Sequence, residues 1–203
     1  MGGAASMGGV GGCRQAPPAN GEPAPTAALP TAGLAGQKVV IFPLTLVATD
    51  EALDWGEAVG PRRAALDRAD SALAESLKER APEVTWVGPD ELRRAARRGT
   101  GVFTDPDQMA TALLRSPSLR QIPDPLWSQM RTLTATTGDR YVMVPAALVF
   151  VPGSAEPGRA ELTVVLADVR TGAIGWRTVA RGEGVDPWAA LRRAVRALTP
   201  GLP

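Results

Sequence analysis

The sequence contains no histidine and only one cysteine, Cys13. Histidine is the commonest general base and the commonest ligand of transition metals, so its absence removes the simplest routes to acid–base catalysis and to a zinc site. A single cysteine forms no internal disulfide, so cysteine pairing gives no information on the redox compartment. No motif names a reaction, and we expect a protein without enzyme activity, metal or cofactor.

A charge imbalance and a long apolar segment are also missing. The chain of 203 residues carries 22 basic and 21 acidic side chains, for a formal net charge of +1. Its overall charge therefore favours neither nucleic acid nor an acidic substrate as the binding partner. No apolar run reaches the ~20 residues that a transmembrane helix requires. The length suits one domain with an appendage.

The first 36 residues differ in composition from the rest. Residues 14–36, RQAPPANGEPAPTAALPTAGLAG, are rich in proline, alanine and glycine and contain no aromatic residue. Such a segment buries too little apolar surface to offset its ordering entropy, and its prolines favour an extended backbone. We therefore predict a residual signal segment over 1–13, a disordered tether over 14–36 and a single α/β domain over 37–203.

The first part of the domain has the pattern of a strand–helix–strand unit. The apolar run at 38–42 is typical of a central strand that is covered on both faces. Residues 62–80 place their leucines on one helical stripe. The segment EVTWVG (83–88) predicts a second strand, which should lie parallel to the first with a right-handed crossover.

The last third predicts three strands and a helix. Residues 140–151 form a long apolar strand, and residues 159–182 form a hairpin that turns at Gly172. Apolar residues recur at helical spacing after Asp186. The predicted fold class is α/β: a mixed sheet with an N-terminal βαβ unit, a C-terminal antiparallel hairpin and packed helices.

Three Asp-Pro pairs, at 105–106, 124–125 and 186–187, are expected to begin helices. Aspartate accepts free backbone N–H groups as an N-cap, and proline suits the first helical position. A catalytic role is the alternative for these aspartates. The last pair ends the segment GEGVDP (182–187), which has half of a dinucleotide-binding fingerprint but lacks the third glycine. We predict an ordinary capped turn there.

Candidate partner-binding residues occur in two places. The segment RRAARR puts Arg93, Arg94, Arg97 and Arg98 on adjacent turns of one helical face. That face fits a contact with phosphate, acidic lipid headgroups or an acidic partner, and it equally fits a solvated surface. No aromatic residues interleave with the arginines, so we expect no nucleic acid. Trp55 lies in a predicted loop. It is either an anchor for a partner protein or a residue of local packing.

The residues Val10-Gly11-Gly12-Cys13 resemble the lipobox of bacterial lipoproteins, with an aliphatic residue three positions before the cysteine and a small residue just before it. The resemblance implies that Cys13 is the site of lipid attachment and that a flexible linker follows it. A signal peptide also needs a basic and an apolar segment, which a start codon farther upstream would supply. The alternative is a free thiol near the terminus.

The domain resembles a group of envelope lipoproteins. KVVIFPL (38–44), DRYVMVPAALVF (139–150) and LTVVLADVRTGAIGWRTVARGEG (162–184) are similar to strands and a hairpin of the curli-secretion lipoprotein, penicillin-binding-protein activator and TolB amino-terminal-domain group. The resemblance implies a non-enzymatic module for protein–protein interaction in the bacterial cell envelope. Arg14 follows the cysteine where aspartate would signal inner-membrane retention, so the analogy favours the outer membrane, facing the periplasm.

Three functions are compatible with these patterns. The first is a non-catalytic bacterial envelope lipoprotein domain that binds or regulates another envelope protein and reaches the membrane through its lipid anchor. The second is a small-molecule-binding α/β module with its site at the carboxyl ends of the parallel strands. The third is a hydrolase with an unrecognised acidic site, which requires two carboxylates in a cleft with shifted pKa values.

Overall fold

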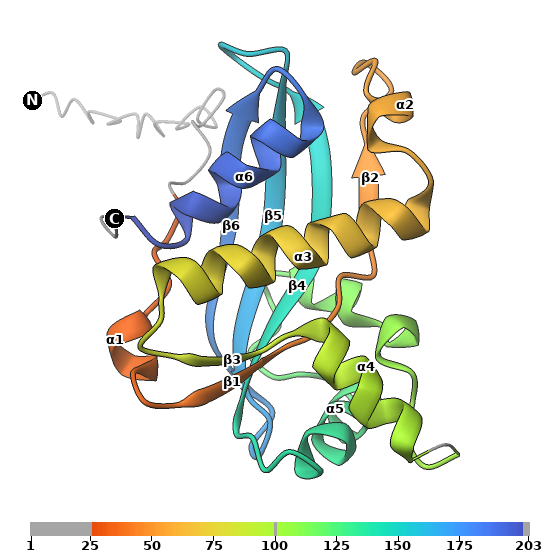
Figure 1. Ribbon diagram of the computed structural model, residues 1–203, viewed down its shortest axis with the longest axis vertical. Coiled ribbons are helices and arrows are strands. Elements are labelled where there is room, and N and C mark those ends of the chain that lie inside the picture. The colour runs from red at the N-terminus through yellow and green to blue at the C-terminus, as the bar shows by residue number, and fades with distance from the viewer. Residues whose placement is uncertain (1–25, 100, 201–203) are drawn as a thin grey trace, which may run out of the picture.

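A mixed β-sheet forms the centre of the protein (Figure 1). The computed structural model describes residues 26–99 and 101–200. The strands of this part are β1 (Lys38–Ile41), β2 (Val47–Thr49), β3 (Thr85–Val87), β4 (Tyr141–Pro152), β5 (Gly158–Asp168) and β6 (Ala173–Gly184). Its helices are α1 (Thr31–Leu34), α2 (Gly56–Val59), α3 (Arg62–Arg80), α4 (Pro89–Arg98), α5 (Leu126–Ala135) and α6 (Pro187–Ala197), with 3₁₀ turns η1 (Pro106–Gln108) and η2 (Thr111–Arg115).

The strand order is β3-β1-β4-β5-β6, and β2 pairs with β4 beyond the end of β1. β1 is parallel to both β3 and β4, whereas β4, β5 and β6 are antiparallel. The connection from β1 to β3 runs through α3, whose bounds agree with the predicted helix over 62–80. At the hairpin turn, Gly172 has a φ of 74°, which glycine adopts without steric cost. The predicted α/β fold class is confirmed.

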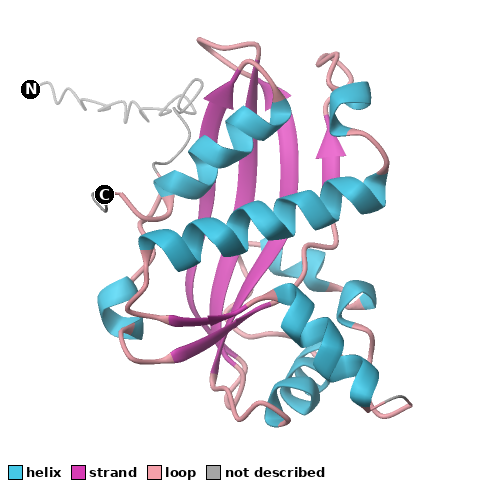
Figure 2. Cartoon of the chain, in the orientation of Figure 1, coloured by secondary structure: helices cyan, strands magenta, loops and turns pink. Residues whose placement is uncertain are grey.

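Helices cover both faces of the sheet. Figure 2 shows α3 and α6 crossing in front of the strands. Val39 and Ile41 of β1 are fully buried in the core that these two helices share with the sheet. Val40 and Phe42 are fully buried on the opposite face, in a second core built with α4, α5, η2 and Met109, which follows η1. In a strand that is covered on both faces, polar residues do not alternate with apolar ones. This is why the segment is a continuous apolar run.

The glycines of GEGVDP serve the packing of α6 on β6. A Cβ atom on Gly182 would collide with the backbone of Ala194, so α6 approaches the strand too closely for any larger residue. The carboxylate of Asp186 accepts hydrogen bonds from the backbone N–H groups of Trp188 and Ala189, at 2.9 and 2.8 Å. The predicted capped turn is therefore confirmed, with helix packing as the reason for its glycine.

The other two Asp-Pro pairs begin helical turns in different ways. Asp105 caps η1 by accepting a bond from the backbone N–H of Asp107 at 3.1 Å. At the second pair the N-cap position belongs to Pro125, and α5 begins one residue later than predicted. The Asp124 carboxylate nevertheless accepts bonds from the backbone N–H and the hydroxyl of Ser128, so it still stabilises the first turn.

Residues 26–36 are packed on the domain, which corrects the C-terminal part of the predicted tether over 14–36. Leu29 and Leu34 are only 5% and 3% exposed and belong to the core beneath α3 and α6. The backbone N–H of Leu29 donates to the carbonyl of Leu198 at 2.8 Å. Two leucines thus bury enough apolar surface to order a stretch whose average composition predicted disorder. The remainder of the predicted tether lies outside the described residues.

The same segment also protects the outer edge of β6. The backbone N–H of Ala27 donates to the hydroxyl of Thr178 at 2.8 Å, and the hydroxyl of Thr26 accepts a bond from the backbone N–H of Arg181 at 3.2 Å. β6 is the last strand of the sheet, and an uncovered edge strand would present unpaired backbone groups to other chains. Residues 26–36 therefore belong to the folded domain.

A chain that begins at Gln37 should be less stable than one that begins at Thr26. Removing Leu29 and Leu34 from the core should lower the free energy of unfolding by roughly 3 kcal/mol or more, since burying each leucine contributes about 1.5–3 kcal/mol. Urea denaturation of the two chains at equal concentration measures the difference. Equal midpoints with equal slopes would show that the segment adds nothing to the core.

Candidate partner-binding site

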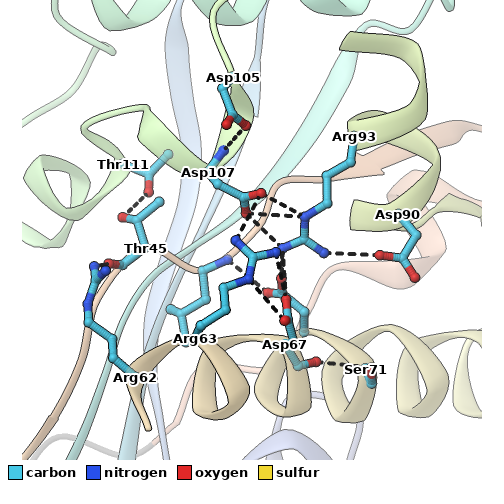
Figure 3. Close-up of polar contacts among 12 residues, drawn as sticks. Thr45, Arg62, Arg63, Asp67, Ser71, Asp90, Arg93, Asp105, Asp107 and Thr111 are labelled. Atoms are coloured by element: carbon cyan, nitrogen blue, oxygen red, sulfur yellow. Dashed lines mark hydrogen bonds and ion pairs between the residues drawn. The ribbon is translucent and has the colours of Figure 1, made fainter. Parts of the chain in front are cut away.

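Arg93 lies at the centre of a buried ion cluster (Figure 3). The residue is only 8% exposed, and its guanidinium contacts carboxylates from three elements. Nη2 donates to Asp70 of α3 at 2.7 Å and to Asp107 of η1 at 2.8 Å. Nη1 donates to Asp90 at 3.0 Å, and Nη2 lies 3.6 Å from an oxygen of Asp67. One side chain of α4 thus holds that helix against α3 and η1.

Asp70 joins this cluster to the sheet. Its carboxylate is 3% exposed and accepts one bond from the backbone N–H of Leu44, at 2.8 Å, as well as the bond from Arg93. Leu44 belongs to the connection between β1 and β2. Burial raises the pKa of Asp70 to about 6, although the bonds from Leu44 and Arg93 act to lower it. The Asp70–Arg93 pair therefore costs desolvation energy that its hydrogen bonds offset only in part.

Arg63 is the second cation of the cluster. It pairs with Asp67 at 2.9 Å and with Asp107 at 3.2 Å. Burial opposes the ionisation of Asp107, but the hydrogen bonds and charges of Arg93 and Arg63 outweigh it and lower the pKa of this carboxyl. Together, two guanidinium groups face four carboxylates within a few ångströms. Asp70 is the most deeply buried of the four, and its burial is the main reason why its pKa is raised.

The cluster resembles an acidic catalytic site in one respect only. Asp70 and Asp107 have pKa values shifted in opposite directions, as the hydrolase hypothesis requires. Both carboxylates, however, are bound to the same guanidinium, and Asp70 also holds a backbone N–H group. Their oxygens are occupied by the fold, so the arrangement acts as a clamp between elements.

A groove between α3 and α4 lies beside the cluster. It has a volume of about 600 Å³ and begins at Gly88 and Pro89, immediately after β3. This is the carboxyl end of a parallel strand, where the small-molecule hypothesis places a site. Its aspartates are already paired with Arg93 and Arg63, which leaves the cations Lys78 and Arg94 among its lining groups.

The four arginines predicted to share one helical face are divided between two environments. Arg93 points into the cluster, whereas Arg94, Arg97 and Arg98 are exposed. In the part of the chain that the structure describes, these three side chains make no hydrogen bond or ion pair. Arg94 and Arg97 also line the groove beside α3. The prediction of a single four-arginine surface is therefore corrected to a surface of three, and Arg93 fixes the helix that carries it.

Trp55 is a core residue. It is 7% exposed, and its ring meets the ring of Phe150 edge-on at 5.7 Å. Phe150 in turn meets Trp188 edge-on at 6.3 Å, so the three rings form one aromatic cluster. A side chain at Gly158 would collide with the Trp55 ring, which packs directly on the strand. The structure thus supports local packing, and the expectation of an exposed anchor is corrected.

The carboxylates of the cluster were not predicted from the sequence, although α3 carries one signal for them. Asp70 lies four residues after Leu66 and three before Leu73, on the buried stripe of the helix. A charged residue on such a stripe requires a buried partner of opposite charge. The partner, Arg93, could not be identified from the sequence, because it lies in a separate element 23 residues away.

Cys13 lies outside the described residues. Among the helices that are described, none has the length and apolar character needed to cross a bilayer. Within the same residues, histidine, cysteine, aspartate and glutamate form no group suited to hold a metal ion.

No known protein family and no curated protein matches the sequence. Among solved structures, the C-terminal domain of LpoB from Salmonella enterica is 19% identical with a TM-score of 0.38, over 74% of this chain and 84% of that one. The PelC dodecamer from Paraburkholderia phytofirmans is 14% identical with a TM-score of 0.41, over 87% and 92%. Lipoprotein GNA1162 from Neisseria meningitidis is 13% identical with a TM-score of 0.35, over 72% and 80%.

Of these three proteins, GNA1162 is described as a lipoprotein. The similarity is low in both identity and TM-score.

Replacing Arg93 should destabilise the fold far more than replacing its neighbour. Arg93→Ala leaves buried carboxylates without their cation, and breaking such a pair costs about 3–5 kcal/mol. Arg94→Ala removes an exposed side chain and should change the free energy of unfolding by less than about 0.5 kcal/mol. Chemical denaturation of both variants measures the contrast. Similar losses for the two variants would contradict the clamp.

The stability contribution of Asp70 should have an unusual pH dependence. Because its pKa rises from 3.8 to about 6 on folding, the folded state binds the proton more tightly, and the contribution grows as the pH falls through 6. Wild type should therefore gain about 1 kcal/mol relative to Asp70→Asn between pH 7 and pH 5. Urea denaturation at the two pH values measures this difference.

Asp107→Asn provides the matched contrast. The pKa of Asp107 is lowered in the fold, so its contribution is present above 3.8 and is lost as the pH falls below that value. The advantage of wild type over this variant should shrink in acid instead of growing. If the difference between wild type and Asp70→Asn were the same at pH 5 and pH 7, the proposed desolvation of Asp70 would be wrong.

Proposed function

We propose that this protein is a non-catalytic bacterial envelope lipoprotein, and that it binds another envelope protein through the exposed arginines of α4. The observation that carries the proposal is the orientation of this helix. Arg93 fixes it from the buried side, while Arg94, Arg97 and Arg98 stand on its outer surface without a partner among the described residues. The helix therefore presents three cations in a fixed arrangement.

An acidic surface of a protein is the partner that this arrangement suits. A guanidinium presents its donors in a planar fork that fits a carboxylate with two parallel bonds. Arginine is enriched at protein interfaces, and complementary charge accelerates association and excludes wrong partners. Because α4 is held by the ion cluster, its backbone needs no further ordering when the partner binds, which favours affinity.

Cys13 is the proposed site of the membrane anchor. In a lipoprotein this residue would carry the acyl chains, and residues 14–25 would connect it to the folded part at Thr26. At polyproline rise this connection spans roughly 40 Å, so the domain would work close to the membrane surface. By the same analogy the anchor would lie in the outer membrane, with the domain in the periplasm. A single acyl chain binds membranes only marginally, whereas several chains anchor stably.

Anchoring and binding should be separable by substitution. In the full-length protein, expressed from its native gene, mass spectrometry should find acylated Cys13 as the first residue. Cys13→Ser should move the protein out of the membrane fraction and leave its thermal unfolding unchanged. The triple variant Arg94→Gln, Arg97→Gln, Arg98→Gln should remain in the membrane but lose at least tenfold in cross-linking to the envelope partner of the wild type.

The control changes the same charge elsewhere on the surface. The exposed residues Arg115, Arg170 and Arg192 are replaced by glutamine together, and this variant should cross-link like the wild type. An unmodified Cys13 in membrane-free protein would refute the lipoprotein assignment. Equal cross-linking by both triple variants would refute the role of the α4 surface and leave the anchor unaffected.

A further inference from the structure

A basic hollow, separate from the groove between α3 and α4, lies where strand β6 meets the chain that follows η2. Its volume is about 270 Å³, and its lining residues are Pro117, Arg120, Ile174, Gly175, Trp176 and Arg177. None of these residues belongs to α4 or to the ion cluster around Arg93. Two of the six are arginines, and none of the six is acidic.

Arg177 lines this hollow with a charge that no carboxylate of the described residues neutralises. Its Nε donates to the carbonyl of Leu114 at 3.2 Å, and its Nη1 donates to the carbonyls of Pro117 and Leu119 at 3.2 and 3.1 Å. Its Nη2 is buried and has no hydrogen-bond partner in the described part of the chain. Three neutral acceptors orient the guanidinium and leave one donor group and the full positive charge unmatched.

Arg120 brings a second charge to the same place. Its side chain is exposed and makes no hydrogen bond or ion pair with any residue that the structure describes. Burial, followed by repulsion from Arg120, lowers the pKa of Arg177, so the two guanidinium groups lie close enough to interact. The backbone of Arg120 is fixed, because its carbonyl accepts a bond from the N–H of Ile174 at 2.9 Å and Gln121 pairs with Ala173.

The walls of the hollow leave room for a ligand. Gly175 is the extra residue of a bulge, since Trp176 pairs with Leu166 while Ile174 pairs with Ala167. A Cβ added to Gly175 would meet only the carbonyl of Leu166, at 4.0 Å. The half-buried indole of Trp176 forms part of the lining. The bulge thus opens the strand edge beside the two charges.

We propose that this hollow binds a small oxyanion, a phosphate or carboxylate group, between Arg120 and Arg177. Such a group would neutralise two cations that otherwise repel each other, and it would accept hydrogen bonds from the exposed guanidinium of Arg120. Binding is independent of the function proposed for α4. A single charged group held by two partly exposed arginines should dissociate at about 1–10 mM, since the net gain of such contacts is only a few kcal/mol.

Nuclear magnetic resonance on the full-length protein tests this site. Sodium phosphate and sodium acetate are titrated separately at constant ionic strength, and the backbone amide shifts of Gly175, Trp176 and Arg177 are followed. We expect saturable shifts in the millimolar range. Arg120→Gln should weaken binding at least fivefold, because it removes one of the two charges but keeps the backbone contacts of the residue. Arg177 is left in place, since it holds three carbonyl groups.

Arg115→Gln is the matched control, since it removes an exposed arginine that does not line the hollow. It should bind like the wild type. Saturation by phosphate alone would assign a phosphate-bearing ligand, and saturation by acetate would assign a carboxylate-bearing one. The proposal is overturned if neither salt gives saturable shifts, or if Arg120→Gln binds as tightly as the wild type.

Discussion

The arrangement of the N-terminal half depends on the bond between Asp70 and Arg93. Asp70 comes from the helix that crosses the sheet, and Arg93 comes from the short helix that follows the edge strand. Through Leu44 the same carboxylate also holds the exit of the central strand. A buried charge is tolerated only when its partners are in place. Three segments that are distant in sequence therefore adopt one relative position.

The Asp70–Arg93 bond also determines which charges lie on the exposed side of α4. The cluster assigns four carboxylates to two arginines, Arg93 and Arg63, and none to the arginines that follow on α4. The side of α4 that faces α3 therefore contacts carboxylates that are already paired with arginine. Its solvent-exposed side carries arginines that are paired with no carboxylate of the described residues. A protein with a net charge of +1 thus carries a localised basic surface. The overall charge of the chain gives no indication of it.

The elements of the fold could be predicted because their signals are local. The leucine stripe of α3 and the hairpin turn at Gly172 each lie within one stretch of sequence, and both are observed as predicted. The ion cluster is different, since Asp70 and Asp107 lie 23 and 14 residues from Arg93. Only the packing of three elements brings them together. Likewise, the burial of Leu29 and Leu34 could not be predicted from the average composition of residues 14–36, because it depends on a core built by later segments.

Comparing two partly buried arginines shows why one site is closed and the other is open to a ligand. Arg93 is surrounded by carboxylates, so its charge is more than neutralised and a further anion would be repelled. Arg177 is held by carbonyl oxygens, which orient a guanidinium through their dipoles but cancel none of its charge. The fold gains rigidity from both residues. The charge of Arg93 itself is matched within the cluster, whereas the charge of Arg177 is paired with no carboxylate of the described residues, and an anion is the chemical group that would neutralise it.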